Sequence, residues 1–476
     1  MRRLFLCVAV VLVGAMPAQP QGDQPRYDVV IRGGRVIDPE TSLDAIRNVG
    51  IRGKEIAAIS EGELAGARII DASGMVVAPG FIDLHQHDLS AEGYRLKAMD
   101  GVTTAVELEI GPPDVRDFLD QRRGKSLINF GTSASHPWVR AATFDRPGTG
   151  VEKLPPSSPA TNSPATPEQI QRMQQHLRNE LKAGGLGVGM GIQYTPGASR
   201  QEVIEMFRVA AERGLPVFVH VRGDRVESVG EVIAAAAVTG APLHVVHINS
   251  SCLKDAPECL RMVAGARGRG LDVTTEAYPY IAGTTQINSA LFNPGWQEKF
   301  EMKYSDLMIS STGERLTKER FEELHASPKP QLVIMFNNTQ AMVDRVIEDP
   351  LTMIASDGAP GHPRNAGTFG RVFAQYVRER RSLSLLDAIR KMSYMPAVRL
   401  ERSTVEARKK GRVQVGADAD LVILDPQTFR DRSTFEKPET PSTGVRFLLV
   451  NGTVVIDGGV VVPHVAPGRA LVGPSR

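Results

Sequence analysis

His85 and His87 carry the first chemical signal in this chain. They follow an apolar stretch at 76–83 with a spacing of i, i+2, which on a β-strand puts both imidazoles on one face. Neutral imidazole is a good ligand for zinc and similar ions. Two imidazoles from the end of one strand therefore supply half of a metal site.

Three more ligand-type residues occur in the same context. His220 ends the apolar run 216–220, His247 ends 243–247, and Asp357 follows the run 353–356. A single histidine at a strand end is usually a structural group with satisfied hydrogen bonds. Repetition of the arrangement on four strands instead predicts one shared metal site, which these residues surround.

The segment 101–111 adds two carboxylates, Glu107 and Glu109, to an otherwise apolar strand. Burying a carboxylate is costly unless a cation receives it. Both side chains share a face, so both could point toward the predicted site. We expect Glu109, nearer the strand end, to be the ligand, with Glu107 as the alternative.

The elements that must position these residues read as alternating strands and helices between 77 and 411. This pattern predicts an α/β fold, a (β/α)8 TIM-type barrel, whose active site lies at the C-terminal ends of the strands. Nine strand-like runs appear where a barrel needs eight, so at least one lies outside it. The runs are 76–83, 103–108, 127–131, 186–190, 216–221, 243–248, 271–275, 332–335 and 352–355.

Both ends of the chain are rich in β-strand signals instead. Gly33-Gly34, Gly53-Lys54 and Asn451-Gly452 each separate two apolar runs and predict hairpin turns. We expect 27–76 and 412–465 to build one composite small β-sandwich domain. The long connection 286–349 is a candidate lid over the barrel mouth.

The N-terminus begins with Arg2 and Arg3, an apolar run at 4–13 and small residues. This pattern is typical of a secretory signal peptide, which we place at 1–18, and predicts a periplasmic or secreted protein. After its removal only Cys252 and Cys259 remain. An oxidising compartment would let them pair, but the sequence leaves a disulfide and two free thiols equally open.

The composition limits the partners. The 476 residues are 42% hydrophobic and 23% charged, with a formal net charge of +2. This balance gives no basic field for nucleic acid. No other long apolar run predicts membrane attachment after signal cleavage, and the oligomeric state, including a homo-oligomer, stays open.

Several motifs give the chain a resemblance. The apolar run ending in His-x-His, the later histidines and the aspartate resemble the amidohydrolase superfamily, which hydrolyses amides with one or two metal ions. Further motifs are similar to those of its D-aminoacylases (N-acyl-D-amino-acid deacylases). They are Gly-Val-Thr-Thr at 101–104, the stretch 189–197, His-Val-Arg at 220–222, Ala-Tyr-Pro-Tyr at 277–280 and the stretch 362–369.

The resemblance implies a function and a site. It implies hydrolysis of the linear amide of an N-acyl amino acid, of D configuration, with one or two Zn²⁺ ions. The small-molecule substrate would meet Asp357 as the catalytic acid and base. The ligands implied are His85, His87, Glu109, His220, His247 and Asp357. The family has a cysteine ligand after the Gly-Val-Thr-Thr strand, where this chain has carboxylates.

Five residues are candidates for binding the substrate. Arg222 and Arg364 could grip its carboxylate through a bidentate fork. Tyr278 and Thr284 resemble positions where the family uses hydroxyls, and Asn249 stands where the family tends to have a lysine.

Other functions stay open on the same fold. One is a cyclic amidase of the hydantoinase or dihydroorotase type, against which the absence of a lysine in 185–194 counts. Another is a dipeptidase, and a third is a non-catalytic binding protein, because a fold alone does not prove activity.

Overall fold

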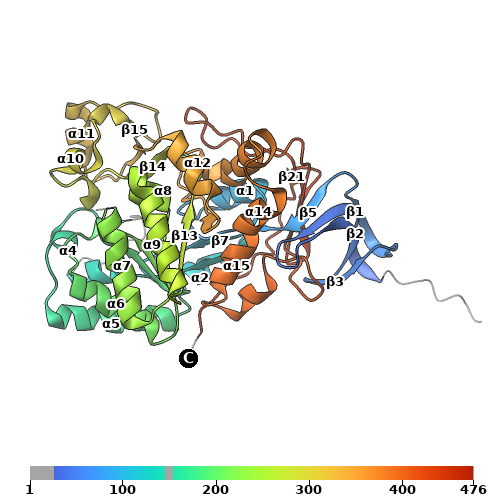
Figure 1. The fold of residues 1–476 in the computed structure, drawn as a ribbon, viewed down its shortest axis with the longest axis horizontal. Coiled ribbons are helices and arrows are strands. Elements are labelled where there is room, and N and C mark those ends of the chain that lie inside the picture. The colour runs from blue at the N-terminus through green and yellow to red at the C-terminus, as the bar shows by residue number, and fades with distance from the viewer. Residues whose placement is uncertain (1–25, 145–153, 224, 475–476) are drawn as a thin grey trace, which may run out of the picture.

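The computed structural model describes residues 26–144, 154–223 and 225–474. The predicted signal peptide at 1–18 lies outside these ranges. Within them, no helix is both long enough and apolar enough to cross a membrane. Figure 1 shows a central barrel, with strands β1 to β3 at one end of the molecule and α10, α11 and β15 at the other.

Eight parallel strands form the barrel. They are β6 (Phe81–Asp83), β7 (Val102–Glu107), β8 (Asn129–Thr132), β10 (Val188–Gly191), β11 (Val217–His220), β12 (Leu243–Val245), β13 (Val273–Ala277) and β17 (Thr352–Ile354). Each pairs in parallel with its neighbour, and the short β9 (Ala134–Ser135) joins β8 to β10. A parallel bridge from Gln86 to Gly358 closes the ring between β6 and β17. The predicted barrel is confirmed.

Amphipathic helices cover the outside of the barrel. They include α1 (Ala91–Met99), α2 (Val115–Arg122), α5 (Pro167–Lys182), α6 (Arg200–Ala211), α7 (Val226–Thr239), α9 (Ala256–Gly268) and α12 (Gln340–Glu348). In α5, Thr166 and Gln169 form a capping box, so the helix begins at Pro167. The buried side chains of α5 recur every three or four residues, at Ile170, Met173, Leu177 and Leu181, and form the stripe that packs on the strands.

The ninth predicted run is the one outside the barrel. Residues 332–335 lie in β16 (Leu332–Phe336), which pairs antiparallel with β14 (Ala282–Gln286) and β15 (Leu307–Ile309). Together with α10 (Trp296–Phe300) and α11 (Lys318–His325), these strands form a subdomain that we call the roof, residues 282–336. The roof has its own apolar cluster, in which Trp296 and Phe321 stack.

The predicted lid at 286–349 differs from the roof at both ends. The insertion begins at Ala282, because β14 is one of its strands. Helix α12 does not belong to it, because Val343, Val346 and Ile347 pack into the barrel core. The predicted range 286–349 therefore extends too far at its C-terminal end, because it includes α12.

Both chain ends share one sheet. Strands β1 (Tyr27–Asp38), β2 (Leu43–Arg52), β3 (Glu55–Ser60), β4 (Gly66–Asp71) and β5 (Val76–Pro79) join β18 (Leu421–Leu424), β19 (Val445–Val450), β20 (Thr453–Asp457) and β21 (Val460–Val461). All nine belong to a single sheet, in which β5 pairs with β1 on one side and β18 on the other. Strand β5 leads straight into β6, so the sheet is fixed directly behind the first barrel strand.

Two of the three predicted hairpin turns are confirmed. The turns at 53–54 and 451–452 join β2 to β3 and β19 to β20. The turn at Gly33-Gly34 is wrong, because β1 continues through it as one strand with a shift in register. Gly33 has a φ of 68°, and a Cβ on Gly34 would lie 2.4 Å from Val77. These glycines serve an irregularity and a close approach rather than a turn.

Candidate metal centre and its cavity

The predicted ligand residues converge at the C-terminal ends of the barrel strands. His85 and His87 follow β6, Glu109 follows β7, and Asp357 follows β17. His220 ends β11 and His247 lies just beyond β12. They form two groups that could each hold a metal ion, and within each group the donor atoms lie within 4.8 Å of one another.

The first group contains His85, His87, Glu109 and Asp357. The two histidines face each other through their Nε2 atoms, 3.1 Å apart. Glu109 Oε2 lies 3.1 Å from His85 Nε2 and 3.0 Å from His87 Nε2. Asp357 Oδ1 lies 3.5 Å and 3.2 Å from the same two nitrogens. Four donor atoms thus surround one point.

The second group contains Glu109, His220 and His247. Glu109 Oε1 lies 2.6 Å from His220 Nδ1 and 3.1 Å from His247 Nε2. The two oxygens of Glu109 therefore face different groups, and this carboxylate could bridge two ions. The geometry separates the two candidate carboxylates: Glu107 does not join either group.

Glu107 instead supports a ligand from behind. Its Oε2 accepts a hydrogen bond from His87 Nδ1 at 2.5 Å, and its Oε1 accepts one from the backbone N–H of Ile110 at 3.0 Å. A partner on the second ring nitrogen fixes the orientation and tautomer of a metal-binding histidine. Glu109 therefore stands in a ligand position, and Glu107 supports a ligand.

Each of the other three histidines has such a support. His85 Nδ1 donates to Glu276 at 2.6 Å, His220 Nε2 to the Gln193 carbonyl oxygen at 2.6 Å, and His247 Nδ1 to Ser251 Oγ at 3.1 Å. We did not predict these three supports. Glu276 is the next-to-last residue of strand β13, close to where the ligands stand on theirs, so a similar signal could have found it. Gln193 lies in the stretch 189–197, whose resemblance gave it no role, and nothing local in the sequence marks Ser251.

Two of the ligand residues have backbone conformations with positive φ, which set the direction of their side chains. His247 has a φ of 31° and Asp357 a φ of 49°, in the left-handed region that non-glycine residues rarely adopt. Such conformations cost of order 1–3 kcal/mol and persist where the surrounding structure holds them. They turn both side chains back over the mouth of the barrel.

The charges in the cluster call for a cation. Glu107, Glu109, Glu276 and Asp357 are all buried, and Arg364 is the only Arg or Lys among the described residues that pairs with any of them. Although burial opposes ionisation, the surrounding histidines hold the pKa of Glu109 well below its usual range. Four buried carboxylates with nitrogen donors between them fit a divalent metal ion.

Asp357 has a second partner. Its Oδ2 lies 2.8 Å from the Arg364 guanidinium. Burial works against the charged form, but Arg364 and then His85 hold the pKa of the Asp357 carboxyl below its usual value. Asp357 is therefore a carboxylate that faces the metal groups with one oxygen and an arginine with the other.

A cavity of about 90 Å³ opens over the cluster. His87, Glu109, His220, His247 and Asp357 line its floor. Roof residues line the opposite wall: Gly283, Thr284, Thr285, Gln286, Leu291, Phe300, Leu332 and Met335. The cavity is thus the space between the barrel mouth and the roof.

Two of the five predicted substrate-binding residues line this cavity. They are Tyr278, at the end of β13, and Thr284, on β14. The Thr284 hydroxyl is buried and has no hydrogen-bond partner, which leaves it available to a ligand.

The other three residues lie elsewhere. Arg222 pairs with Glu231 at 2.8 Å and donates to two backbone carbonyls, so it braces a loop. Asn249 donates to the Tyr278 backbone carbonyl at 3.2 Å. Arg364 is buried behind Asp357, with its guanidinium 4.5 Å from the centre of the Tyr278 ring, and does not line the cavity. The sequence predicted a direct grip of a substrate carboxylate by Arg222 or Arg364. In the structure Arg222 pairs with Glu231 and Arg364 with Asp357, and neither lines the cavity.

Comparisons with known proteins agree with this geometry. The sequence profile of the Amidohydrolase family matches residues 157–456. The chain is 31% identical to the N-acyl-D-glutamate deacylase of Alcaligenes xylosoxydans xylosoxydans, over 94% of this chain and 97% of that one. It is 29% identical to the D-aminoacylase of the same organism, over 91% and 96%.

A solved structure resembles the whole chain. The N-acyl-D-glutamate deacylase of Bordetella bronchiseptica, crystallised with zinc and a phosphonate inhibitor, superimposes with a TM-score of 0.79 and 27% identity. The match covers 94% of this chain and all of that one. The similarity therefore extends over nearly the full length of both chains.

Proposed function

We propose that this chain, which belongs to the amidohydrolase family, is a zinc-dependent hydrolase that cleaves N-acyl-D-amino acids to a carboxylate and a free D-amino acid. One observation carries the proposal: four histidines, Glu109 and Asp357 converge where the barrel strands end, and all of them except His85 line the floor of one cavity. The names of the most similar relatives supply the substrate class.

The residues around the cavity can carry out the hydrolysis. The two ligand groups would hold zinc, which when bound would supply an acidified water and a positive charge next to the amide carbonyl. Asp357 then accepts the proton of the attacking water and returns it to the leaving nitrogen, which would otherwise leave poorly. The Arg364 guanidinium keeps Asp357 ionised and ready to accept. Glu109 belongs to both ligand groups and so fixes their positions relative to each other.

The wall of the cavity narrows the substrate further. The described lining contains no Lys or Arg, while Ile110, Leu154, Leu291, Leu332 and Met335 make its far side apolar. A second carboxylate, in addition to the α-carboxylate that every N-acyl amino acid has, would lose its water at this apolar surface without gaining a cationic partner. We therefore favour a neutral, apolar amino-acid side chain over glutamate or aspartate.

We also propose that the protein acts outside the cytoplasm. The N-terminal signal-peptide pattern supports this location, and Cys252 and Cys259 are paired as a disulfide in the structure. Detection of the processed protein in a periplasmic or culture fraction would test it.

A substrate panel tests the proposed activity. Purified protein with measured zinc content is offered N-acetyl derivatives of D- and L-leucine, D-methionine and D-glutamate, together with a hydantoin and a dipeptide. We expect release of the free amino acid from the D-leucine and D-methionine derivatives. Turnover of only the hydantoin or the dipeptide would replace the proposal by a cyclic amidase or a dipeptidase.

A further inference from the structure

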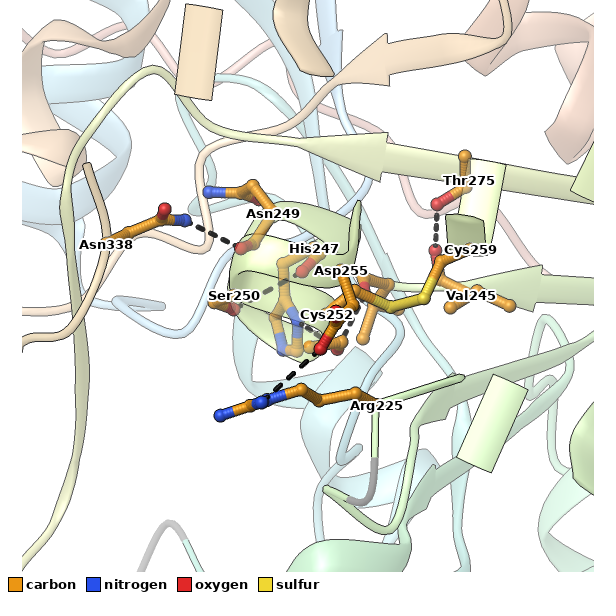
Figure 2. Close-up of a disulfide and its surroundings, with 12 residues drawn as sticks. Arg225, Val245, His247, Asn249, Ser250, Cys252, Asp255, Cys259, Thr275 and Asn338 are labelled. Carbon is orange, nitrogen blue, oxygen red and sulfur yellow. Dashed lines mark hydrogen bonds and ion pairs between the residues drawn. A yellow bond between two sulfur atoms is a disulfide. The ribbon is translucent and has the colours of Figure 1, made fainter. Parts of the chain in front are cut away.

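The disulfide Cys252–Cys259 lies directly behind one of the candidate metal ligands. It joins two cysteines seven residues apart, both fully buried. Cys252 ends α8 (Ile248–Cys252), and Cys259 lies in the first turns of α9. Figure 2 shows the disulfide beside the short helix α8, which begins directly after His247.

Helix α8 is too short to be stable on its own and depends on contacts with its surroundings. It has five residues, and isolated helices of that length are unstable in water. Its two flanking residues, His247 and Leu253, have φ values of 31° and 47°. Both conformations are costly for side chains of this kind and need external restraint.

The position of α8 decides how His247 is presented. Ser251, one residue before Cys252, accepts the hydrogen bond from His247 Nδ1 at 3.1 Å. The same hydroxyl faces the Val246 carbonyl oxygen at 3.3 Å, so its proton is directed away from the imidazole. His247 Nε2 is thereby left as the acceptor that faces Glu109, at 3.1 Å.

Helix α9 is a firm anchor by comparison. Its thirteen residues bury Cys259, Leu260 and Val263 in the main barrel core. A covalent link from the end of α8 to the first turns of α9 therefore ties the short helix, with its two costly flanking conformations, to the longer one.

We propose that the Cys252–Cys259 disulfide is a positioning element for His247. By holding the end of α8 against α9, it keeps Ser251 on the imidazole and sets the metal affinity of the group formed by Glu109, His220 and His247. This goes beyond the proposed activity, because it concerns how one metal position is built. Metal binding is read without substrate, so failure of this proposal would leave the hydrolase proposal standing.

The main experiment compares zinc binding by the full chain and by Cys252→Ser/Cys259→Ser. Zinc affinities are measured by competition with a chromogenic chelator, well below the unfolding temperature. The His247→Ala variant identifies which binding step belongs to this group. We expect loss of the disulfide to weaken that step about 10- to 100-fold, the range seen when a ligand's support is removed. Any other binding step should stay within about two-fold of the unmodified protein.

Two further variants separate positioning from general destabilisation. Val263→Ala removes core contacts of α9 and leaves the disulfide and Ser251 intact, so it should lower the melting temperature and leave zinc affinity unchanged. Ser251→Ala should weaken the same binding step as loss of the disulfide. Because both act through His247, their combination should weaken zinc binding by less than the product of the separate effects.

Three results would overturn the proposal. One is wild-type zinc affinity in the disulfide-free protein, the second is an equal loss in Val263→Ala, and the third is full additivity with Ser251→Ala. Should the serine pair fail to fold, Cys252→Ala/Cys259→Ala, which buries no hydroxyl, is measured in its place against the same expectations.

Discussion

The floor and the roof of the cavity are built in opposite ways. The floor is polar and rigid: its ligand-type residues stand at the ends of barrel strands, and the second nitrogen of each of its four histidines has a partner within about 3.1 Å. The roof comes from one inserted subdomain, presents mostly apolar side chains to the cavity and has its own aromatic core. We therefore infer that the floor carries out the chemical step and that the roof selects the side chain of the substrate.

This division makes the two walls separable by experiment. Changes to the floor should reduce the chemical step or metal binding for every substrate alike. Changes to the roof should alter the Michaelis constant and depend on the side chain of the substrate. If changes to the floor and changes to the roof affected the same kinetic parameter, this division of roles would be wrong.

Metal removal should have the largest effect. Dialysis of the protein against a strong chelator should abolish hydrolysis of every N-acyl-D-amino acid, a loss of about 10³-fold or more, because the ion supplies several kcal/mol of transition-state stabilisation. Activity should return on addition of zinc. The fold should persist throughout, as circular dichroism would show. Full activity in protein shown to be free of metal would remove the floor's assigned role.

Replacement of Asp357 by asparagine should come next. It removes the proton acceptor while keeping the shape of the side chain, so kcat should fall by about 10²- to 10⁴-fold. The fall should be similar for all substrates, and zinc content should stay close to that of the unmodified protein. Asp387→Asn, at an exposed ion pair on the outer helices, is the matched control and should leave kcat unchanged. Normal turnover by Asp357→Asn would exclude the aspartate as acid and base.

The floor was also the part that the sequence could predict. His220 and Asp357 follow short buried strands, and in a barrel all such ends meet at one rim, so a pattern local in sequence becomes a cluster in space. The choice of Glu109 over Glu107 rested on distance along one strand, and the bend after β7 places Glu109 between the two ligand groups. Supports such as Gln193 and Ser251 could not be predicted, since their role depends on contacts between separate loops.

The roof shows why the remainder could not be predicted. Strand β16 has the apolar composition of a barrel strand, yet it belongs to the roof. Helix α12 lies within the range predicted as a lid, yet it packs on the barrel. Periodicity reports that a face is buried but not what buries it. The same limit applies to Arg222. Its position two residues after His220 predicts a side chain in the cavity, but in the structure its guanidinium pairs with Glu231.

A substitution in the roof should have an intermediate and selective effect. Leu291→Ala removes apolar surface from the cavity wall, so kcat/KM for N-acetyl-D-leucine should fall by about ten-fold, mainly through KM. The derivative of D-alanine, which does not reach this wall, should change little. Leu324→Ala provides the control, because Leu324 is in the same apolar cluster but does not line the cavity. Equal losses for both substrates would mean that the roof does not select the side chain.

The smallest effect should come from the ion pairs that fasten the roof to the barrel. Glu301, next to the cavity residue Phe300, pairs with Lys254 at 2.6 Å and Arg225 at 3.2 Å. Glu301 is largely exposed, and exposed pairs contribute little, so Glu301→Gln should raise KM less than about five-fold and leave kcat unchanged. The rise should disappear at high salt, which screens the same pairs in the unmodified protein. Glu298→Gln on the same helix is the control. A fall in kcat rather than a rise in KM would show that the roof also acts on the chemical step.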